Sequence, residues 1–284
     1  MTDFQARTVL ITGCSSGIGL CVAEGLRERG HRVIASARKA KDVDRLKAKG
    51  FEAVQLDLDD SHSVRAGFEQ ALEITEGRLD VLFNNGAWGL PGAVEDLSRE
   101  ALAAQLETNL LGWLQLTNLA IPIMRRQGFG RIIQNSSVLG FVAMPYRGAY
   151  VASKFALEGL TDTLRLELKG SGIDVSLIQP GPIESRFRAN SKLAFERWID
   201  YQNSVHAPQY RKQLARLNKS GPAAPFTLPP QAVLKKVVHA IESRRPKPRY
   251  AVTVPTHLFA VLKRFLSVRM MDAVLLKASG GGKR

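Results

Sequence analysis

The feature that most constrains this fold is a repeated alternation of short apolar runs and longer segments with helical spacing over residues 1–185. The runs are rich in β-branched residues, and several are apolar almost throughout, as in strands covered on both faces. The expected strands are 8–12, 31–36, 51–56, 79–84, 130–136 and 173–180. Strands and helices alternating in this way predict an α/β fold with one doubly wound parallel sheet of about seven strands.

The remaining part of the chain is less regular. We interpret 1–284 as a single nucleotide-binding domain, with a substrate lid inserted at 186–225 and a basic amphipathic segment at 254–284. Its expected elements are a helix over 190–205, a basic run, a proline-rich loop over 220–230, a helix over 229–245, a strand over 248–255 and a helical face over 256–266. The sheet therefore has a helical C-terminal extension on its substrate side.

Charge is distributed unevenly between these two parts. Residues 186–284 contain 20 of the 40 basic residues but only 4 of the 26 acidic ones. A solvated surface, an anionic membrane surface and an anionic substrate each explain this excess. Because no DNA- or RNA-binding motif accompanies the charge, we expect no nucleic-acid partner.

Targeting and redox signals are few. No apolar run reaches the length of a membrane-spanning helix, and the first residues enter a strand without the apolar region of a secretory signal. Cys14 and Cys21 have neither a disulfide framework nor a metal-binding spacing, so we expect reduced thiols, no metal and a cytoplasmic location.

A glycine-rich turn follows the first expected strand. The sequence TGCSSGIG (12–19) places Gly13, Gly17 and Gly19 between that strand and a helix. Glycines allow the backbone to approach a pyrophosphate closely, and the helix N-terminus offers free N–H groups and a positive dipole end. This turn therefore predicts a dinucleotide site.

The end of the second strand indicates which dinucleotide binds. An NAD-preferring site usually has a carboxylate there, whereas this chain has Arg38 and Lys39. A guanidinium can bind a 2′-phosphate through paired hydrogen bonds, so Arg38 predicts NADP(H).

A tyrosine and a lysine lie one helical turn apart in YVASK (150–154). A free phenol has a pKa of about 10, too high for a proton shuttle near neutrality. A nearby ammonium favours the phenolate, so Lys154 is expected to lower the pKa of Tyr150. Beside a dinucleotide site, this pair predicts acid–base chemistry.

Together these motifs resemble the short-chain dehydrogenase/reductases. The motifs TGCSSGIG (12–19), NNGA (84–87), Asn109, Ser137, YVASK (150–154) and PGPI (180–183) follow the family's order. The likeness is greatest to the branch of retinol and 17β-hydroxysteroid dehydrogenases and their bacterial relatives. The resemblance implies a Rossmann-type domain in which Tyr150 is the acid or base, Lys154 lowers its pKa, Ser137 binds the substrate oxygen and Asn109 holds a water in a proton relay.

The resemblance also implies a set of cofactor-binding residues. These are Gly13, Ser15, Ser16, Gly17, Ile18, Gly19, Arg38, Asp57, Leu58, Asn84, Gly86, Tyr150, Lys154, Pro180, Gly181 and Ile183. Asp57 and Leu58 are expected to flank the adenine. Two positions depart from the family pattern: Gly86 and Ala87 stand in exchanged order, and Ser185 replaces the usual threonine.

The lid indicates the class of substrate. Its apolar residues are Leu193, Phe195, Trp198, Ile199 and Tyr201, which either face a lipophilic compound or pack the lid onto the body. We predict an NADP(H)-dependent oxidoreductase acting on a lipophilic aldehyde, retinoid or steroid-like ketone and the corresponding alcohol. Two alternatives are a 3-oxoacyl thioester reductase and a non-catalytic NADP-binding sensor or membrane-surface adaptor.

Partners other than the substrate are expected to bind at the C-terminal helical face. Its residues 256–266 are expected to pack on the body, with peripheral membrane contact and subunit pairing in a homo-oligomer as the other uses.

Overall fold

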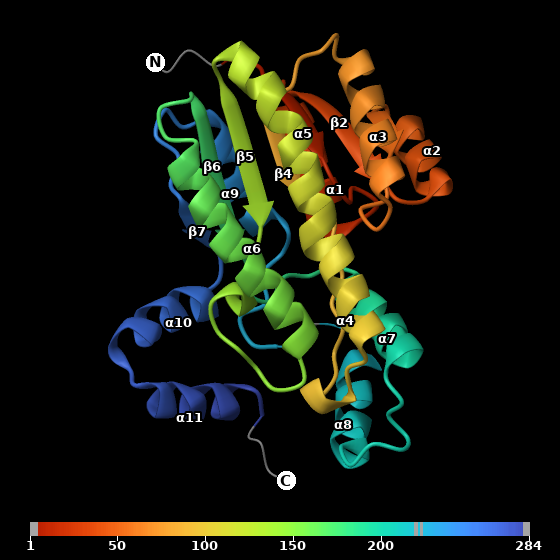
Figure 1. Cartoon of the computed structure of the whole chain (residues 1–284), viewed down its shortest axis with the longest axis vertical. Coiled ribbons are helices and arrows are strands. Elements are labelled where there is room, and N and C mark those ends of the chain that lie inside the picture. Colours follow the sequence, from red (N-terminus) through yellow and green to blue (C-terminus); the bar gives the residue numbers. More distant parts are fainter. Residues whose placement is uncertain (1–4, 219–220, 222–223, 281–284) are drawn as a thin grey trace.

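The computed structural model describes residues 5–218, 221 and 224–280 (Figure 1). The described residues form a seven-stranded parallel sheet in the order β3-β2-β1-β4-β5-β6-β7, which confirms the doubly wound sheet. Its strands are β1 (Thr8–Ile11), β2 (Arg32–Ala37), β3 (Glu52–Gln55), β4 (Val81–Asn84), β5 (Gly130–Asn135), β6 (Ile173–Gln179) and β7 (Arg249–Ala251). Residues 219–220 and 222–223 of the expected lid, and 281–284 of the C-terminal segment, lie outside the described residues.

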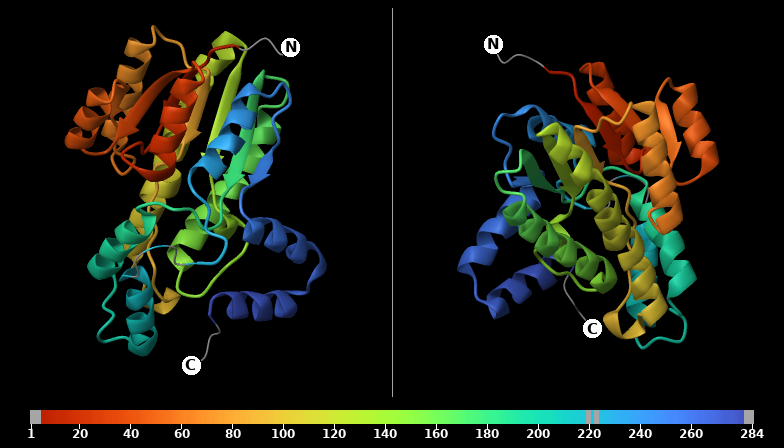
Figure 2. Two further views of the ribbon diagram at one scale, coloured as in Figure 1. Left: turned by 180° about the vertical axis from the view of Figure 1, so that it is seen from behind. Right: turned by 45° about the horizontal axis from the view of Figure 1, so that its top comes forward.

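Helices cover both faces of the sheet. Those that pack on it are α1 (Gly17–Glu28), α2 (Ala40–Ala48), α3 (Ser61–Ile74), α5 (Gly112–Gln127), α6 (Gly148–Glu167) and α9 (Gln231–Glu242). The others are α4 (Arg99–Leu106), α7 (Phe187–Trp198), α8 (Ala207–Asn218), α10 (Val254–Phe265) and α11 (Val268–Ala278), with short helical turns η1 (Val94–Asp96), η2 (Glu107–Leu111) and η3 (Val138–Gly140). α1 and α9 lie on one face and α5 and α6 on the other, as Figures 1 and 2 show.

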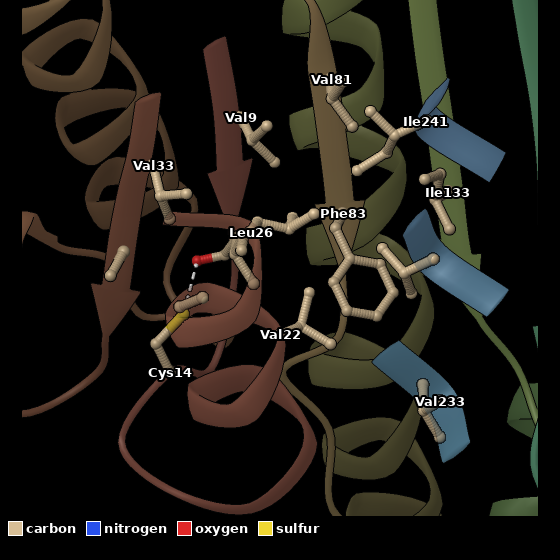
Figure 3. Packing of buried hydrophobic residues seen from close by; sticks show 14 of the residues in the cluster. Val9, Cys14, Val22, Leu26, Val33, Val81, Phe83, Ile133, Val233 and Ile241 are labelled. Atoms are coloured by element: carbon tan, nitrogen blue, oxygen red, sulfur yellow. Dashed lines mark hydrogen bonds between the residues drawn. The ribbon is translucent and has the colours of Figure 1, made fainter. Parts of the chain in front are cut away.

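The alternating side chains of the strands explain the two layers of core. Val9 and Ile11 of β1 point to the face covered by α1 and α9, whereas Leu10 points to the face covered by α3, α5 and α6. All three are fully buried. Figure 3 shows the first layer, in which strand valines pack under Val22 and Leu26 of α1.

The order of the strands positions the site. After β1 the chain builds outward through β2 and β3, then returns to place β4 on the other side of β1. The loops that follow β1 and β4 therefore diverge at the carboxyl edge of the sheet, and ligands bind at such a reversal in doubly wound folds. Gly13 and Gly86 lie on these two loops.

The long helical pattern between the fourth and fifth strands is divided into three pieces. A π-helical turn, η2, separates α4 from α5 and contains Asn109. Such turns interrupt the regular backbone hydrogen bonds and are frequent at functional sites.

The lid and the end of the chain depart from the expected elements. The predicted helix over 190–205 ends at Trp198, because Ile199 is extended and an Asn203–Asp200 side-chain hydrogen bond stabilises the bend that follows. The basic run instead forms α8. The last strand ends early, since Pro255 in the first turn of α10 has no N–H for a sheet.

Two helical arms extend beyond the carboxyl edge of the sheet. Figures 1 and 2 place α7 and α8 on one side and α10 and α11 on the other. The expected packing of the C-terminal helical face holds only in part: Phe259 is buried against Val138 and Leu139, together with Met271 and Leu275 of α11, whereas Leu258, Val261 and Phe265 are exposed. None of the described helices is long and apolar enough to cross a bilayer.

Candidate active site

The glycine loop is shaped by close contact between backbones. Gly13 has φ +72°, and a Cβ there would lie 2.6 Å from the Cα of Gly86. A Cβ on Gly19 would lie 2.4 Å from the carbonyl oxygen of Gly13. Both positions therefore require glycine for space, which leaves the first turn of α1 open at the loop.

A polar network that the sequence analysis missed holds this loop. The amides of Asn85 and Gly86 donate to the hydroxyl of Thr12 at 2.8 and 2.9 Å. The side chain of Asn135 donates to that of Asn85 at 2.9 Å, and the ammonium of Lys154 donates to the carbonyl of Asn135 at 2.8 Å. One chain of contacts thus joins the glycine loop to the Tyr–Lys helix. The available signal was a polar residue at or just after the carboxyl end of each strand: Thr12, Asn85 and Asn135.

Ser137, Tyr150 and Lys154 lie in one large cleft with the glycine loop. The cleft has a volume of about 1650 Å³, and all three residues line it. Ser137 follows β5 and caps η3 by accepting a hydrogen bond from the amide of Leu139 at 3.1 Å. Tyr150 and Lys154 are one turn apart on α6, and the Lys154 nitrogen is 5.8 Å from the Tyr150 ring centroid.

Burial dominates the protonation of this pair. It raises the pKa of Tyr150 to about 12, with a smaller opposing influence from the Ser137 hydroxyl. It lowers the pKa of Lys154 to about 7, against the attraction of Glu158. The lowered phenol pKa expected from the sequence is therefore not seen, because burial is the largest influence on Tyr150 and Lys154 is not among the groups that shift its pKa. Tyr150 is a protonated acid at neutral pH.

Asn109 lies behind the cleft. It is fully buried in the π-helical turn, and its amide donates to the carbonyl of Trp88 at 2.8 Å and to Ser153 at 3.2 Å. Its carbonyl accepts from the Trp88 amide at 3.2 Å. Asn109 therefore fixes the Trp88 backbone, and its place in a proton relay stays a prediction.

Most of the expected cofactor residues line the cleft. These are Gly13, Ser15, Ser16, Gly17, Ile18, Gly86, Tyr150, Lys154, Pro180, Gly181 and Ile183. Asn84 does not, since its buried amide donates to Thr117 and Gln134, and Asn85 faces the cleft instead.

The residues expected at the adenine end, Arg38, Asp57 and Leu58, are not among those that line the cleft. Arg38 is exposed directly after β2, and Leu58 is buried against Gly86. Asp57 follows β3 and accepts a hydrogen bond from the amide of Asp59 at 3.2 Å. Arg45, which the sequence analysis missed, donates to the carbonyl of Ser15 at 2.8 Å.

The apolar residues of the lid mostly pack inward. Phe195 is fully buried and stacks on Tyr201, Ile199 is buried beside them, and Leu193 is 67% exposed on the outside. The apolar groups that line the cleft come from several segments: Leu90, Met144, Phe187, Phe226, Leu258 and Val274. Phe187 lies edge-on to Tyr150, with ring centroids 5.4 Å apart. The sequence could not separate these two groups, because both are apolar at helical spacing.

The residues present fit a nicotinamide dinucleotide. The glycine loop leaves room for a pyrophosphate at the N-terminus of α1, where the Ser16 side chain makes no capping hydrogen bond. The side-chain oxygen of Asn135 is buried at the cleft without a hydrogen-bond partner, which marks a polar atom suited to a ligand.

Comparison with known proteins decides the family. The profile of the short chain dehydrogenases matches residues 7–194, which contain the glycine loop, Ser137, Tyr150 and Lys154. The chain belongs to this family. Its fold and its branch agree with the resemblance drawn from the motifs, and it is an oxidoreductase.

Curated short-chain dehydrogenases resemble most of the chain. An uncharacterized oxidoreductase, YbbO of Escherichia coli (strain K12), is 44% identical over 95% of this chain and 94% of its own. Human 17-beta-hydroxysteroid dehydrogenase type 1 is 35% identical over 88% and 78% of the two chains. Human retinol dehydrogenase 8 is 32% identical over 90% and 85%.

Solved structures of the family carry either nicotinamide cofactor. A short chain dehydrogenase/reductase from Burkholderia phymatum in complex with NAD has a TM-score of 0.77 and 27% identity, over 97% of this chain and 96% of its own. An actinorhodin polyketide ketoreductase with NADPH has a TM-score of 0.69 and 27% identity, over 87% and 95%. A nicotinamide cofactor is thus common to these relatives, and its phosphorylation differs among them.

Proposed function

We propose that this protein is an NADP(H)-dependent oxidoreductase that interconverts a lipophilic carbonyl compound and its alcohol. The observation that carries the proposal is that Ser137, Tyr150 and Lys154 line one cleft with the glycine loop and with apolar side chains. An aldehyde, a retinoid or a steroid-like ketone suits that lining.

Each residue has a role that its surroundings support. A bound nicotinamide cofactor supplies the hydride in the reducing direction. Tyr150, whose pKa is about 12, donates its phenol proton to the carbonyl oxygen, and the Ser137 hydroxyl binds that oxygen as negative charge develops. Lys154, held by the carbonyl of Asn135, lies beside the phenol and orients the cofactor ribose.

Arg38 supports the choice of NADP(H). It is exposed at the tip of β2, where the family places the group that contacts the adenosine ribose, and Lys39 adds positive charge nearby, whereas Arg45 pairs with Asp42. The side chain of Arg38 has no ion-pair partner among the described residues, so its guanidinium is available to a 2′-phosphate.

The decisive experiment follows NADPH oxidation with a panel of fatty aldehydes, retinal and steroid ketones. We expect turnover in the intact protein and a loss of about 100- to 10,000-fold in Tyr150→Phe, which removes the transferable proton and retains the ring. Equal turnover in Tyr150→Phe would refute the assigned acid. Turnover of none of these carbonyls by cofactor-saturated protein would refute the proposed reaction.

The same assay tests the cofactor. Arg38→Ala is expected to reduce the preference for NADPH over NADH by about 10-fold or more, because a charged hydrogen-bonding group is lost. Arg65→Ala is the matched control, since Arg65 is an exposed arginine of α3. An unchanged preference in Arg38→Ala would show that another group selects the cofactor.

A further inference from the structure

Basic residues gather along the cleft with almost no acidic counterpart. Among the described residues that line it, seven are basic and only Glu184 is acidic. One of the seven, Lys154, belongs to the catalytic group. The others include Arg147, Arg188, Lys212 and Arg216, which come from the start of α6 and from the two helices of the lid.

Helix α8 turns a polar stripe toward the cleft. Gln209, Lys212, Gln213 and Arg216 line the cleft and are spaced three or four residues apart, so they share one helical face. The neighbouring face holds the helix in place, because Tyr210 is fully buried and its hydroxyl donates to Asp96. The orientation of the stripe is therefore set by packing.

Arg147 and Arg216 have no ion-pair partner among the described residues. Arg147 has only a marginal hydrogen bond to the carbonyl of Pro145, at 3.5 Å, and Arg216 donates to Gln213 at 3.3 Å. Both side chains are half-buried. Burial, with a smaller contribution from repulsion by Arg216, lowers the pKa of Arg147 to about 10. Two like charges held together in this way favour an anion between them.

The carboxylates at the base of α8 are already engaged elsewhere. Glu95 pairs with His206, and Asp96 accepts from Tyr210 and from Ser204. Neither carboxylate lines the cleft. Independently, the side-chain oxygen of Gln209 is buried on the stripe without a partner, so its amide is free to turn and bind a ligand.

The position of these cations separates them from the cofactor phosphates. Arg188 donates to the carbonyl of Gly221 at 2.8 Å, and its charge lowers the pKa of Arg216, so it belongs to the lid side of the cleft. Helix α8 lies at the end of the molecule away from β1–β3, as Figures 1 and 2 both show. Arg147 immediately precedes α6 and lies one turn before Tyr150. An anion held by Arg147 and Arg216 thus belongs to the compound that reaches Tyr150.

We propose that Arg147 and Arg216 form a subsite for an anionic end group of the substrate, so that the preferred substrates are lipophilic carbonyl compounds carrying a carboxylate. The apolar lining of the cleft between this subsite and Tyr150 binds the hydrocarbon part of the substrate, and Tyr150 contacts its carbonyl group. The reaction rests on the function proposed above, whereas binding of the anion does not.

The kinetic test compares ω-oxo fatty acids of increasing length with their methyl esters, using NADPH. We expect kcat/KM to favour the acid about 10- to 100-fold at the best length, as for a hydrogen bond to a charged group. Arg216→Met and Arg147→Met should reduce this acid-to-ester ratio toward one. Arg244→Met is the control, because Arg244 is exposed and lies outside the cleft. A ratio near one in the intact protein at every length would overturn the proposal.

A binding test separates the subsite from the reaction. Decanoate and decanol are titrated by calorimetry into the full chain saturated with NADPH. Decanoate should bind more tightly than decanol, and Arg216→Met should weaken decanoate by about 10-fold or more while Arg244→Met does not. If no carbonyl is turned over but this pattern holds, the proposed reaction fails and the subsite stands.

Two binding outcomes would overturn the subsite. Equal decanoate affinity in Arg216→Met and Arg244→Met would show that the α8 cation does not hold the anion. Weakened NADPH binding in Arg216→Met with unchanged decanoate affinity would assign the cluster to the cofactor. Charge reversal in Arg216→Glu adds a stronger form of the test, because it should make the ester the better substrate.

Discussion

The glycine loop and the lid helices α7 and α8 line the same cleft, but the loop presents closely packed backbone and the helices present charged side chains. At the loop, backbone packs on backbone: a Cβ on Gly13 would meet the Cα of Gly86. On α8 the cleft is bounded by long charged side chains such as Arg216. The difference suggests that the cofactor is recognised by a shape that tolerates no side chain, and the substrate by groups that can be exchanged without altering the fold.

The ion pairs follow the same division. In the first part of the chain, Arg32 pairs with Glu52 and Arg78 with Asp80. At the cleft side of α8, Arg216 has no acidic partner among the described residues. Charge is thus balanced where it serves the fold and unbalanced where a ligand is expected.

The largest expected effect tests the glycine loop. Gly19→Ala places a methyl group 2.4 Å from the Gly13 carbonyl oxygen, so the loop must shift and NADPH affinity should fall by about 100-fold or more. Calorimetric titration of NADPH measures the loss. Gly159→Ala is the matched control in another helix, where nothing lies within 4 Å, and thermal unfolding should show it about 0.5–1 kcal/mol more stable. Equal NADPH affinity in both variants would contradict the role of the glycine loop in binding the cofactor.

The second effect tests how firmly the C-terminal arm belongs to the body. Phe259→Ala removes a buried ring that packs near Val138 and Leu139, and denaturant unfolding should show a loss of about 3 kcal/mol. Phe265→Ala on the same helix removes a ring that is 80% exposed, and should change stability by less than about 0.5 kcal/mol. Similar losses in both would show that the arm packs differently.

The third effect concerns the outer face of this arm. Phe265 and Val261 are exposed there beside Lys263 and Arg264, a combination that suits an anionic membrane surface. We predict that the chain floats with vesicles containing anionic lipid and that Phe265→Ser reduces the bound fraction several-fold. Neutral vesicles are the control. Concentration-dependent dimerisation lost in Phe265→Ser, without flotation, would instead assign the face to a second copy.

The smallest effect concerns the charge of Lys154. Its pKa of about 7 is held up by Glu158, so Glu158→Gln should lower that pKa further. The ammonium is lost as pH rises through the pKa, and the rise in the KM for NADPH should therefore begin at a lower pH. Glu167→Gln, an exposed position on the same helix, should leave the pH profile in place. A shift to higher pH in Glu158→Gln would contradict the stated coupling.

Much of the site could be predicted because it depends on local patterns. The strands, the glycine turn and the Tyr150–Lys154 pair each lie within a few consecutive residues, and their periodicity or spacing carries the information. Element ends were less accurate, as the π-helical turn around Asn109 and the break at Ile199 illustrate. The first depends on distant contacts of Asn109 with Trp88 and Ser153, and the second on a local side-chain hydrogen bond between Asn203 and Asp200.

The sequence by itself determined the family, the doubly wound sheet and the residues that meet at its carboxyl edge, because the hydrophobic period and the order of the motifs are properties of the sequence alone. Only the tertiary structure decided that Phe195 packs inward while Phe187 faces Tyr150, that burial raises rather than lowers the pKa of Tyr150, and that Arg147 and Arg216 line the same cleft. Each of these depends on which distant side chains surround a group, since burial and charge repulsion arise from neighbours in space.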